Sequence, residues 1–325
     1  MGRGLIVAVV TFGLMVPWGR AVTDLLLAKG IGKRVRSDGP ASHQTKSGTA
    51  TMGGLYFMAG IALVGAALLV AGQHTVLGPL IAMLAFGALG VLDDLRGLGD
   101  RDGVGWLARS KFPAQWLVAI VVALAVYWMG GSRHVSLLGE AVGVNLGWWF
   151  VPVLALLLVF MSNAVNLTDG LDGLAGGVGA IAYGVYGILA MSDGETGLSL
   201  FCFAVVGALG AFLWFNLHPA RLFMGDVGSE ALGAGLAVVA MLSGHWLILP
   251  LVGVVFVAEA LSVMAQVTWF KYTKRRYGAG RRILRMAPLH HHFELLGWSE
   301  TQVTLRFWIV AAVAAGLSLA LELGV

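Results

Sequence analysis

The chain is dominated by long apolar stretches that are separated by short polar segments. A helix rises about 1.5 Å per residue, so roughly 20 apolar residues cross a hydrocarbon layer of about 30 Å. The stretches therefore predict ten membrane helices, and the segment 130–147, with its alternating residues, predicts a small external hairpin. The approximate bounds of the helices are 4–28, 54–72, 76–92, 113–130, 148–163, 174–191, 197–215, 230–243, 246–270 and 303–323.

Most basic residues lie in connections on one face of this arrangement. Ten spans put both termini on one side, where only Arg3 and Arg133 are basic. The connections on the other side contain Lys29, Lys33, Arg34, Arg36, Lys46, Arg96, Arg101, Arg109, Lys111, Lys271, Lys274, Arg275, Arg276, Arg281, Arg282 and Arg285. Short loops rich in Lys and Arg mark the cytoplasmic side, so these connections are predicted to be cytoplasmic and both termini outside.

Composition supports one all-α polytopic membrane domain over residues 1–325. Of the 325 residues, 58% are hydrophobic and 12% are charged, against about 25% charged in a soluble protein. The chain starts with Arg3 and an apolar run, as a secretory signal does. No small-residue cleavage site follows, so we interpret this segment as the first membrane helix. Cys202 has no partner for an internal disulfide. The net charge of +4 is concentrated at the membrane face, so nucleic acid is not an expected partner.

Polar motifs occupy five of the predicted cytoplasmic connections. Residues 43–54 (HQTKSGTATMGG) include Lys46 and Thr51 ahead of a helix, where backbone N–H groups suit phosphate oxygens, although Gly and Thr also serve ordinary turns. Asp93 and Asp94 follow the third span, and two acids at a helix C-terminus oppose its dipole. Neighbouring helical residues point about 100° apart, so one carboxylate can face a site while the other supports it.

The third and fourth motifs contribute further acids. In residues 163–177 (NAVNLTDGLDGLAGG), Asp169 and Asp172 are three apart without a nearby Lys or Arg, which favours a bound cation or polar ligand. The alternative is a tight turn with Asn and Asp caps. In residues 216–230 (NLHPARLFMGDVGSE), Asp226 lies among glycines and is approachable by a hard cation, while Phe223 can stack on a base. Their ordinary interpretations are a turn acid and an interfacial aromatic.

The fifth motif, residues 288–294 (PLHHHFE), follows the densest basic cluster. Three histidines can bind zinc, but the motif has no Cys and no i, i+4 spacing. Beside a phosphate site, imidazoles donate hydrogen bonds and exchange protons near neutral pH, and we prefer this interpretation to a solvated run. Within the spans, Arg20 and Asp24 are spaced to pair, whereas Glu259 has no partner nearby in sequence. A charge at mid-bilayer costs roughly 2.5–3.5 kcal/mol, so each should face the interior or water.

In this order, the motifs resemble the polyprenyl-phosphate N-acetylhexosamine-1-phosphate transferase superfamily over nearly the whole chain. The stretches 286–294 (MAPLHHHFE) and 297–300 (GWSE) are similar to its muramoyl branch, the phospho-N-acetylmuramoyl-pentapeptide-transferases. The resemblance implies transfer of phospho-N-acetylmuramoyl-pentapeptide from its UDP donor to undecaprenyl phosphate, giving lipid I of peptidoglycan and UMP. It further implies a requirement for Mg²⁺, a place in the bacterial inner membrane and a homodimer.

The resemblance also assigns residues. Asp226 matches the family's metal ligand, and Asp93 and Asp94 match its paired acids, of which Asp93 would be a base toward the lipid phosphate or a covalent nucleophile. His290 and His291 are expected in the catalytic site. The uridine pocket would be Gly170, Leu171, Asp172 and Phe223. The further nucleotide or phosphate contacts would be Lys46, Thr51, Lys111, Asn166, Asp169, Asn216, Gln266 and His292.

The sequence departs from the family pattern in three places. Ala50 stands where Pro is usual, which loosens the backbone but removes no functional group. Arg96 and Arg101 follow the Asp pair where Lys is common, and the basic stretch between Gln266 and His290 is longer than usual.

Two alternatives remain at the level of sequence. One is a relative that uses UDP-N-acetylglucosamine, with sugar choice in the last cytoplasmic loop. The other is a secondary transporter, which ten spans would suit. Transporters place their binding groups near the bilayer midplane, whereas here the polar motifs lie at one face.

Overall fold

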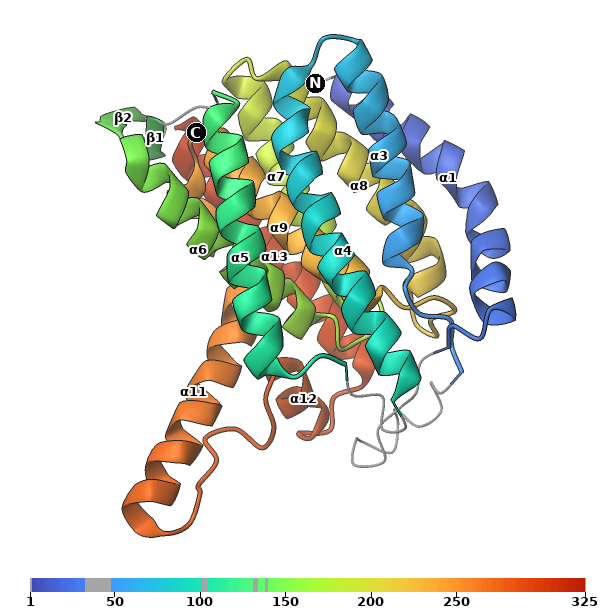
Figure 1. Cartoon of the computed structure of the whole chain (residues 1–325), viewed down its shortest axis with the longest axis vertical. Helices are drawn as coiled ribbons and strands as arrows, with labels where there is room; N and C mark the ends of the chain where they lie inside the picture. Colours follow the sequence, from blue (N-terminus) through green and yellow to red (C-terminus); the bar gives the residue numbers. More distant parts are fainter. Residues whose placement is uncertain (1, 33–47, 101–104, 131–133, 138–139, 325) are drawn as a thin grey trace.

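The computed structural model describes residues 2–32, 48–100, 105–130, 134–137 and 140–324, which form a bundle of helices (Figure 1). The helices are α1 (Gly2–Ala28), α3 (Gly54–Val70), η1 (His74–Val76), α4 (Leu77–Gly99), α5 (Ala108–Trp128), η2 (Gly147–Trp149), α6 (Phe150–Thr168), α7 (Leu174–Ser192), α8 (Thr196–Asn216), α9 (Gly225–Leu242), η3 (Trp246–Ile248), α10 (Leu249–Val252), α11 (Val254–Tyr277), α12 (Leu289–Glu294) and α13 (Glu300–Leu323).

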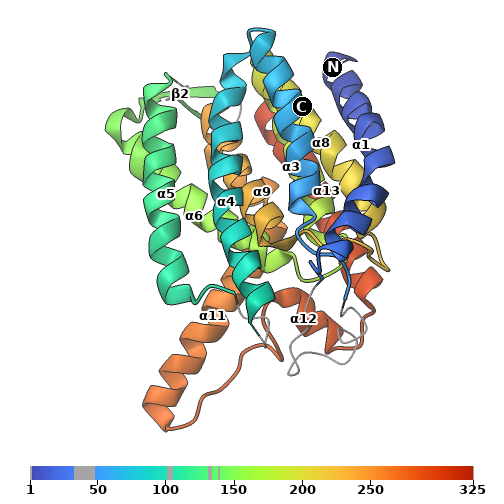
Figure 2. The same cartoon turned by 45° about the vertical axis from the view of Figure 1, so that its right-hand side comes forward.

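The expected membrane helices are present. In the described part of the chain, nine helices are long and apolar enough to cross a membrane, and α3 is a shorter apolar helix of 17 residues. The predicted hairpin is also confirmed, with β1 (His134–Leu137) antiparallel to β2 (Glu140–Asn145). α1 begins and α13 ends at the same end of the bundle as this hairpin, whereas α12 lies at the opposite end (Figures 1 and 2). Which end faces the cytoplasm stays a prediction.

Several helices differ from their predicted bounds: α5 and α9 begin five residues earlier and α6 ends five residues later than expected. Two differences are larger. The span expected at 246–270 is broken: the short helix α10 begins at Leu249, with Pro250 in its first turn, and Gly253 separates it from α11. α11 then continues to Tyr277, so the basic residues from Lys271 to Arg276 lie on a helix and not in a loop. α4 likewise continues past Asp94 to Gly99, since no helix breaker follows the two acids at once. The two acids were expected at the end of their helix. They lie instead within its last two turns.

The centre of the bundle is α9, whose residues from Val227 to Met241 are all buried. It contacts α3, α4, α6 and α7. Glycines allow the closest of these approaches: a Cβ on Gly90 of α4 would lie 2.3 Å from the backbone oxygen of Asp226, and one on Gly54 would lie 2.2 Å from the backbone nitrogen of Gly228. Small residues at such crossings are typical of membrane helices. As a result, the starts of α3 and α9 and the last turns of α4 meet at one end of the bundle.

Candidate active site

An ammonium group surrounded by three carboxylates lies where α4, α5 and α9 meet. The Lys111 Nζ is 2.5 Å from Asp93 Oδ2, 2.7 Å from Asp226 Oδ2 and 2.6 Å from Glu230 Oε1. All three contacts are ion pairs, and the one with Asp226 is also a hydrogen bond that the ammonium donates. Glu230 is fully buried and Asp93 is nearly so. With all three acids ionised, negative charge is in excess in a site of low solvent access, which favours binding of a further cation.

Asp94 has a different role from its neighbour. Its two carboxylate oxygens accept hydrogen bonds from the backbone N–H groups of Asp226 (3.1 Å) and Val227 (3.0 Å). These groups lie in the first turn of α9, which lacks intrahelical acceptors and carries the positive end of the helix dipole. Asp93 thus faces Lys111 while Asp94 fixes the start of the helix that carries Asp226, a division consistent with the expected 100° offset.

Asp226 is oriented from a third helix. The Asn166 side chain on α6 donates from Nδ2 to Asp226 Oδ1 (2.9 Å) and to Ser229 Oγ (2.9 Å). Gly225, which precedes Asp226, has a positive φ of 72°, and a Cβ there would lie 2.7 Å from Asp94 Oδ2. Glycine is the residue that adopts this conformation without strain. The position of Asp226 therefore depends on Lys111, Asn166 and the Gly225 backbone together.

A cavity of about 280 Å³ opens beside these acids. Its lining comes from five segments distant in sequence: Thr51, Asp93, Asp94, Gly97, Leu98, Gly105, Trp106, Asn166, Asp169, Gly225 and Asp226. The Trp106 backbone N–H donates to Asp93 Oδ1, and a Cβ on Gly105 would lie 2.0 Å from that oxygen. The Arg96 guanidinium lies 4.2 Å from the centre of the Trp106 ring. The segment before α5 thus closes over Asp93.

His290 of the histidine motif packs against Gly170, which follows the cavity residue Asp169. A Cβ on Gly170 would lie 2.2 Å from His290 Nε2, so the glycine leaves room for the imidazole next to Asp169. Glu259 of α11 holds His290 from the other side: its Oε1 accepts from the His290 backbone N–H and lies 3.1 Å from Nδ1. Both side chains are buried. This contact supplies the partner that the sequence could not assign to Glu259.

The other two histidines have separate partners. His291 Nδ1 lies 2.7 Å from Glu294 Oε2, and His292 Nδ1 accepts from the Arg285 backbone N–H at 3.1 Å. Among the residues that the structure describes, the three rings do not form a metal-ligand cluster, so the zinc alternative gains no support.

Several expected nucleotide contacts make hydrogen bonds within the protein. Asp172 Oδ2 lies 2.9 Å from His218 Nδ1 and accepts from Ala220 N, while the Asp172 N–H donates to Glu300. Asn216 accepts from Gly173 N and donates to Leu222 O. Phe223 and Leu171 are buried. The hydrogen bonds of Asp172 and Asn216 thus link the α6–α7 connection to the end of α8 and to the start of α13.

Gln266 makes its hydrogen bonds with a neighbouring segment of the chain. The Gln266 side chain accepts from Ile283 N (2.9 Å) and Leu284 N (3.0 Å) and donates to Leu284 O (3.1 Å), so its amide binds the segment after α11. Lys46 lies outside the described residues. The structure thus brings Thr51, Asp93, Asp94, Asn166, Asp169 and Asp226 to one cavity, with Lys111 in contact with two of them.

Glu230 and Trp106 were not among the predicted site residues. Glu230 follows Asp226 by four residues, a spacing that puts both on one face of a helix, and this signal was available in the sequence. The contact between Trp106 and Asp93 depends on how the segment before α5 folds, and no local pattern predicts it.

The acid cluster suits a divalent metal ion. Carboxylate oxygens of Asp93, Asp226 and Glu230 lie within 4.8 Å of one another, and oxygen donors are the ligands that hard cations prefer. The Lys111 ammonium already lies among these oxygens. A second group, Asp172, His218 and Glu300, also has metal-ligand spacing but is not part of the cavity lining.

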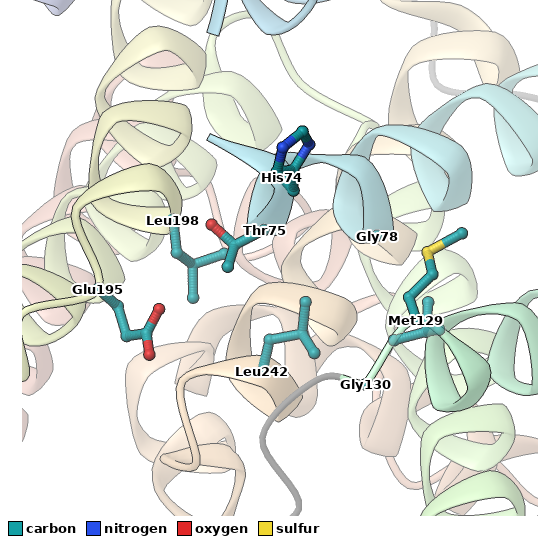
Figure 3. Close-up of a pocket in the computed structure, with 9 residues that line it drawn as sticks. His74, Thr75, Gly78, Met129, Gly130, Glu195, Leu198 and Leu242 are labelled. Atoms are coloured by element: carbon teal, nitrogen blue, oxygen red, sulfur yellow. The ribbon is translucent and has the colours of Figure 1, made fainter. Parts of the chain in front are cut away.

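A second cavity, of about 210 Å³, lies at the opposite end of α4 and α9 (Figure 3). Its lining is mostly apolar, and Thr75 and Glu195 point toward its centre between Leu198 and Leu242 (Figure 3). None of the residues that the sequence analysis selected lines it. The candidate active site is therefore the acidic cavity.

Comparison with known proteins identifies the family of the chain. Residues 76–244, which contain Asp93, Lys111 and Asp226, match the model of glycosyl transferase family 4. The phospho-N-acetylmuramoyl-pentapeptide-transferases of two Chloroflexus aurantiacus strains are each 48% identical to the chain, and that of Chloroflexus aggregans is 46% identical. Each alignment covers 100% of this chain and 91% of the relative. The chain therefore belongs to the phospho-N-acetylmuramoyl-pentapeptide-transferase family, within glycosyl transferase family 4.

Proposed function

We propose that the protein transfers phospho-N-acetylmuramoyl-pentapeptide from its UDP donor to undecaprenyl phosphate, giving lipid I and UMP in peptidoglycan synthesis. The observation that carries this proposal is the identity of 46–48%, over the full length of this chain, to transferases of this name. The buried cluster of acids around Lys111 supports it, because a phosphoryl transfer between two anionic substrates requires control of charge.

The reaction exchanges one phosphoanhydride for another. An oxygen of the lipid phosphate forms a bond to the donor phosphorus that carries the sugar, and the bond from that phosphorus to the UMP oxygen breaks. UMP leaves with the electron pair and the bridging oxygen. Positioning of the two substrates at one membrane face supplies much of the catalysis, since it replaces an encounter of two molecules with a bound geometry.

We assign Mg²⁺ as the metal, with Asp226 as its ligand and Asp93 or Glu230 as further candidates. When bound, the ion would offset charge on the pyrophosphate. Lys111, released from one of its three carboxylates, would contact a phosphate oxygen, and Asn166 would keep Asp226 oriented. Asp93 would act as a base toward the lipid phosphate or as a covalent nucleophile. Thr51 and Asp169 would contact the substrates in the cavity.

The nucleotide would lie beside the cavity, near Gly170, Leu171, Asp172 and Phe223. His290 would donate a hydrogen bond from its free edge, with Glu259 fixing the ring, and His291 would lie next to it. Lys46, Asn216, Gln266 and His292 complete the expected contacts. For Asn216 and Gln266 the expected role is indirect, because their amides hold neighbouring backbone groups.

The test is a product assay with the purified protein. With UDP-N-acetylmuramoyl-pentapeptide, undecaprenyl phosphate and Mg²⁺, we expect UMP and lipid-linked product in equal amounts, and none with Asp226→Ala. UDP-N-acetylglucosamine, offered alone, should give neither product. Turnover of that sugar and not of the muramoyl donor would replace the proposal with the acetylglucosamine alternative, and absence of any product would refute it.

A further inference from the structure

A basic arm extends from the end of the bundle that carries the candidate active site. We use this name for residues 266–285, which comprise the last turns of α11 and the chain that returns toward α12. In Figures 1 and 2, α11 runs past the ends of the other helices, so the arm lies away from the bundle. The helix is continuous with a predicted membrane span, which begins at Val254.

The arm is strongly and uniformly positive. Its seven basic residues are all exposed, and no Asp or Glu occurs between Glu259 and Glu294. In the described part of the chain, none of the seven forms a salt bridge with a carboxylate. The seven residues are Lys271, Lys274, Arg275, Arg276, Arg281, Arg282 and Arg285.

The arm is held in one conformation by specific contacts. Gln266 binds the backbone of residues 283 and 284, and Thr273 Oγ1 accepts from the Arg281 N–H at 2.8 Å. A Cβ on Gly280 would lie 2.4 Å from the Phe270 ring, so the returning chain packs closely on the helix. The backbone that carries the charges is therefore ordered in advance, and a ligand need not order it on binding.

Exposed aromatic residues accompany the charges. Trp269, Phe270, Tyr272 and Tyr277 are 38–58% exposed, and the first and third rings lie 5.8 Å apart. Trp and Tyr next to Lys and Arg, just beyond a membrane span, are typical of the interface between lipid and water. An acidic soluble protein would account for the charges but not for the aromatic rings on a helix that continues from the membrane.

We propose that the basic arm binds the headgroups of anionic phospholipids at the membrane surface. The phosphates would contact the Lys and Arg side chains, and the aromatic rings would lie at headgroup depth. Clusters of four to eight basic residues beside a membrane helix attract such lipids electrostatically. The proposal does not depend on the transferase activity.

The test is lipid binding by the full chain in detergent, measured by native mass spectrometry. Phosphatidylglycerol and phosphatidylcholine are titrated separately against the wild type and Arg275→Gln/Arg276→Gln. A basic residue near an anionic surface contributes about fivefold in affinity, so the double variant should bind phosphatidylglycerol about 30-fold more weakly. Binding of phosphatidylcholine should not change.

Two variants control for charge and for position. Arg275→Lys/Arg276→Lys should retain most of the binding, because charge and not shape is recognised. Arg3→Gln/Lys29→Gln removes two exposed charges on and just beyond α1 and should bind phosphatidylglycerol as the wild type does. Equal loss in this control, or unchanged phosphatidylglycerol binding by Arg275→Gln/Arg276→Gln, would overturn the proposal.

The acceptor lipid is also an anionic lipid, so the assay must separate the two. We expect the KM for undecaprenyl phosphate, measured in detergent without phospholipid, to be the same in the wild type and Arg275→Gln/Arg276→Gln. A raised KM with unchanged phosphatidylglycerol binding would show that the arm holds the acceptor instead. If the wild type has no transferase activity, the proposed function fails while the phosphatidylglycerol titration still tests the arm.

Discussion

Glu230 shows how single residues set the charge of the site. It is buried and lies 2.6 Å from Lys111, which also contacts Asp93 and Asp226. Removing one partner of an isolated buried ion pair costs roughly 3–5 kcal/mol, because the other charge is left alone. Lys111 keeps two carboxylates when Glu230 is neutralised, so this cost does not apply here. The change instead reduces an excess of negative charge.

We therefore predict that Glu230→Gln does not lower the melting temperature in EDTA, whereas the rise in melting temperature on addition of Mg²⁺ becomes smaller. At a fixed ligand concentration, a ligand stabilises the folded state more when its affinity is higher, so the smaller rise reports weaker cation binding. Thermal unfolding in detergent measures both quantities. Glu195→Gln, at the second cavity, is the matched control and should alter neither (Figure 3). A lower melting temperature of Glu230→Gln in EDTA would make Glu230 a purely structural partner of Lys111.

Asp226→Asn tests the residue on which the proposed metal site depends. The side chain keeps its size and can still accept hydrogen bonds, but it loses the charge that attracts a cation. Loss of several kcal/mol of charge stabilisation corresponds to a fall in turnover of at least about 1000-fold. Binding of Mn²⁺, followed by electron paramagnetic resonance, should be lost in parallel. The control is Asp24→Asn, at an exposed site on α1, which should leave turnover and Mn²⁺ binding unchanged. Retention of Mn²⁺ binding by Asp226→Asn would contradict the assignment of Asp226 as the metal ligand.

At the scale of elements, the approach of α4 to α9 determines whether the acids meet. Gly90 lies at this crossing, and a Cβ there would be 2.3–2.4 Å from backbone atoms of Asp226 and Val227. Backbone cannot move aside as a flexible side chain can, so the two helices must separate. Asp93 and Asp94 are on the next turn of α4, and their contacts with Lys111 and the start of α9 would lengthen.

We predict that Gly90→Ala lowers stability by about 1–3 kcal/mol, as overpacking does, and lowers turnover in the protein that remains folded. Gly184→Ala is the matched control: this glycine also lies within a helix, and a Cβ there meets nothing within 4 Å. Alanine in an open helical position stabilises by up to about 1 kcal/mol. The two variants should therefore shift the melting temperature in opposite directions. A Gly90→Ala protein with wild-type stability and turnover would show that the crossing tolerates a wider separation.

The membrane helices were predictable from sequence because their length and apolar character are local properties. The hairpin was predictable from the alternation of residues and the adjacent glycines. The break at Gly253 was missed because the apolar run continues through both Pro250 and Gly253, the two residues that mark it. The extension of α11 to Tyr277 was missed because basic residues were interpreted as a loop, although they are compatible with a helix.

Within the site, the sequence indicated which acids carry function but not how they pair. Asp93 and Asp226 were selected from their motifs, yet the position of Lys111 between them depends on tertiary contacts, one of which spans 115 residues of sequence. The partnership of Glu259 with His290 is of the same kind. Gln266 was expected to contact the substrate from its motif match. Its amide instead binds the neighbouring segment, a contact that the match does not reveal.

At the scale of the whole molecule, the two ends of the bundle differ in charge. The end with the acidic cavity and α12 also carries the basic arm, Lys29, Arg96 and Arg109, whereas Arg3 is the basic residue of the described part of the other end. Short basic segments remain on the cytoplasmic side during insertion, so the cavity should open to the cytoplasm, where a UDP-linked donor would be available. Both termini would then face outward.

This orientation can be tested with single engineered thiols, because the native Cys202 is buried. Ala71→Cys lies just beyond α3 at the end of the bundle near the hairpin, and Leu295→Cys follows α12 at the other end; both positions are exposed. A thiol reagent that cannot cross membranes should label Ala71→Cys in intact spheroplasts and label Leu295→Cys only after lysis. The wild type should remain unlabelled in both conditions. Labelling of Leu295→Cys in intact spheroplasts would show the opposite orientation. The cavity would then lie on the side opposite to a cytoplasmic nucleotide donor, and the proposed reaction would need another source of that donor.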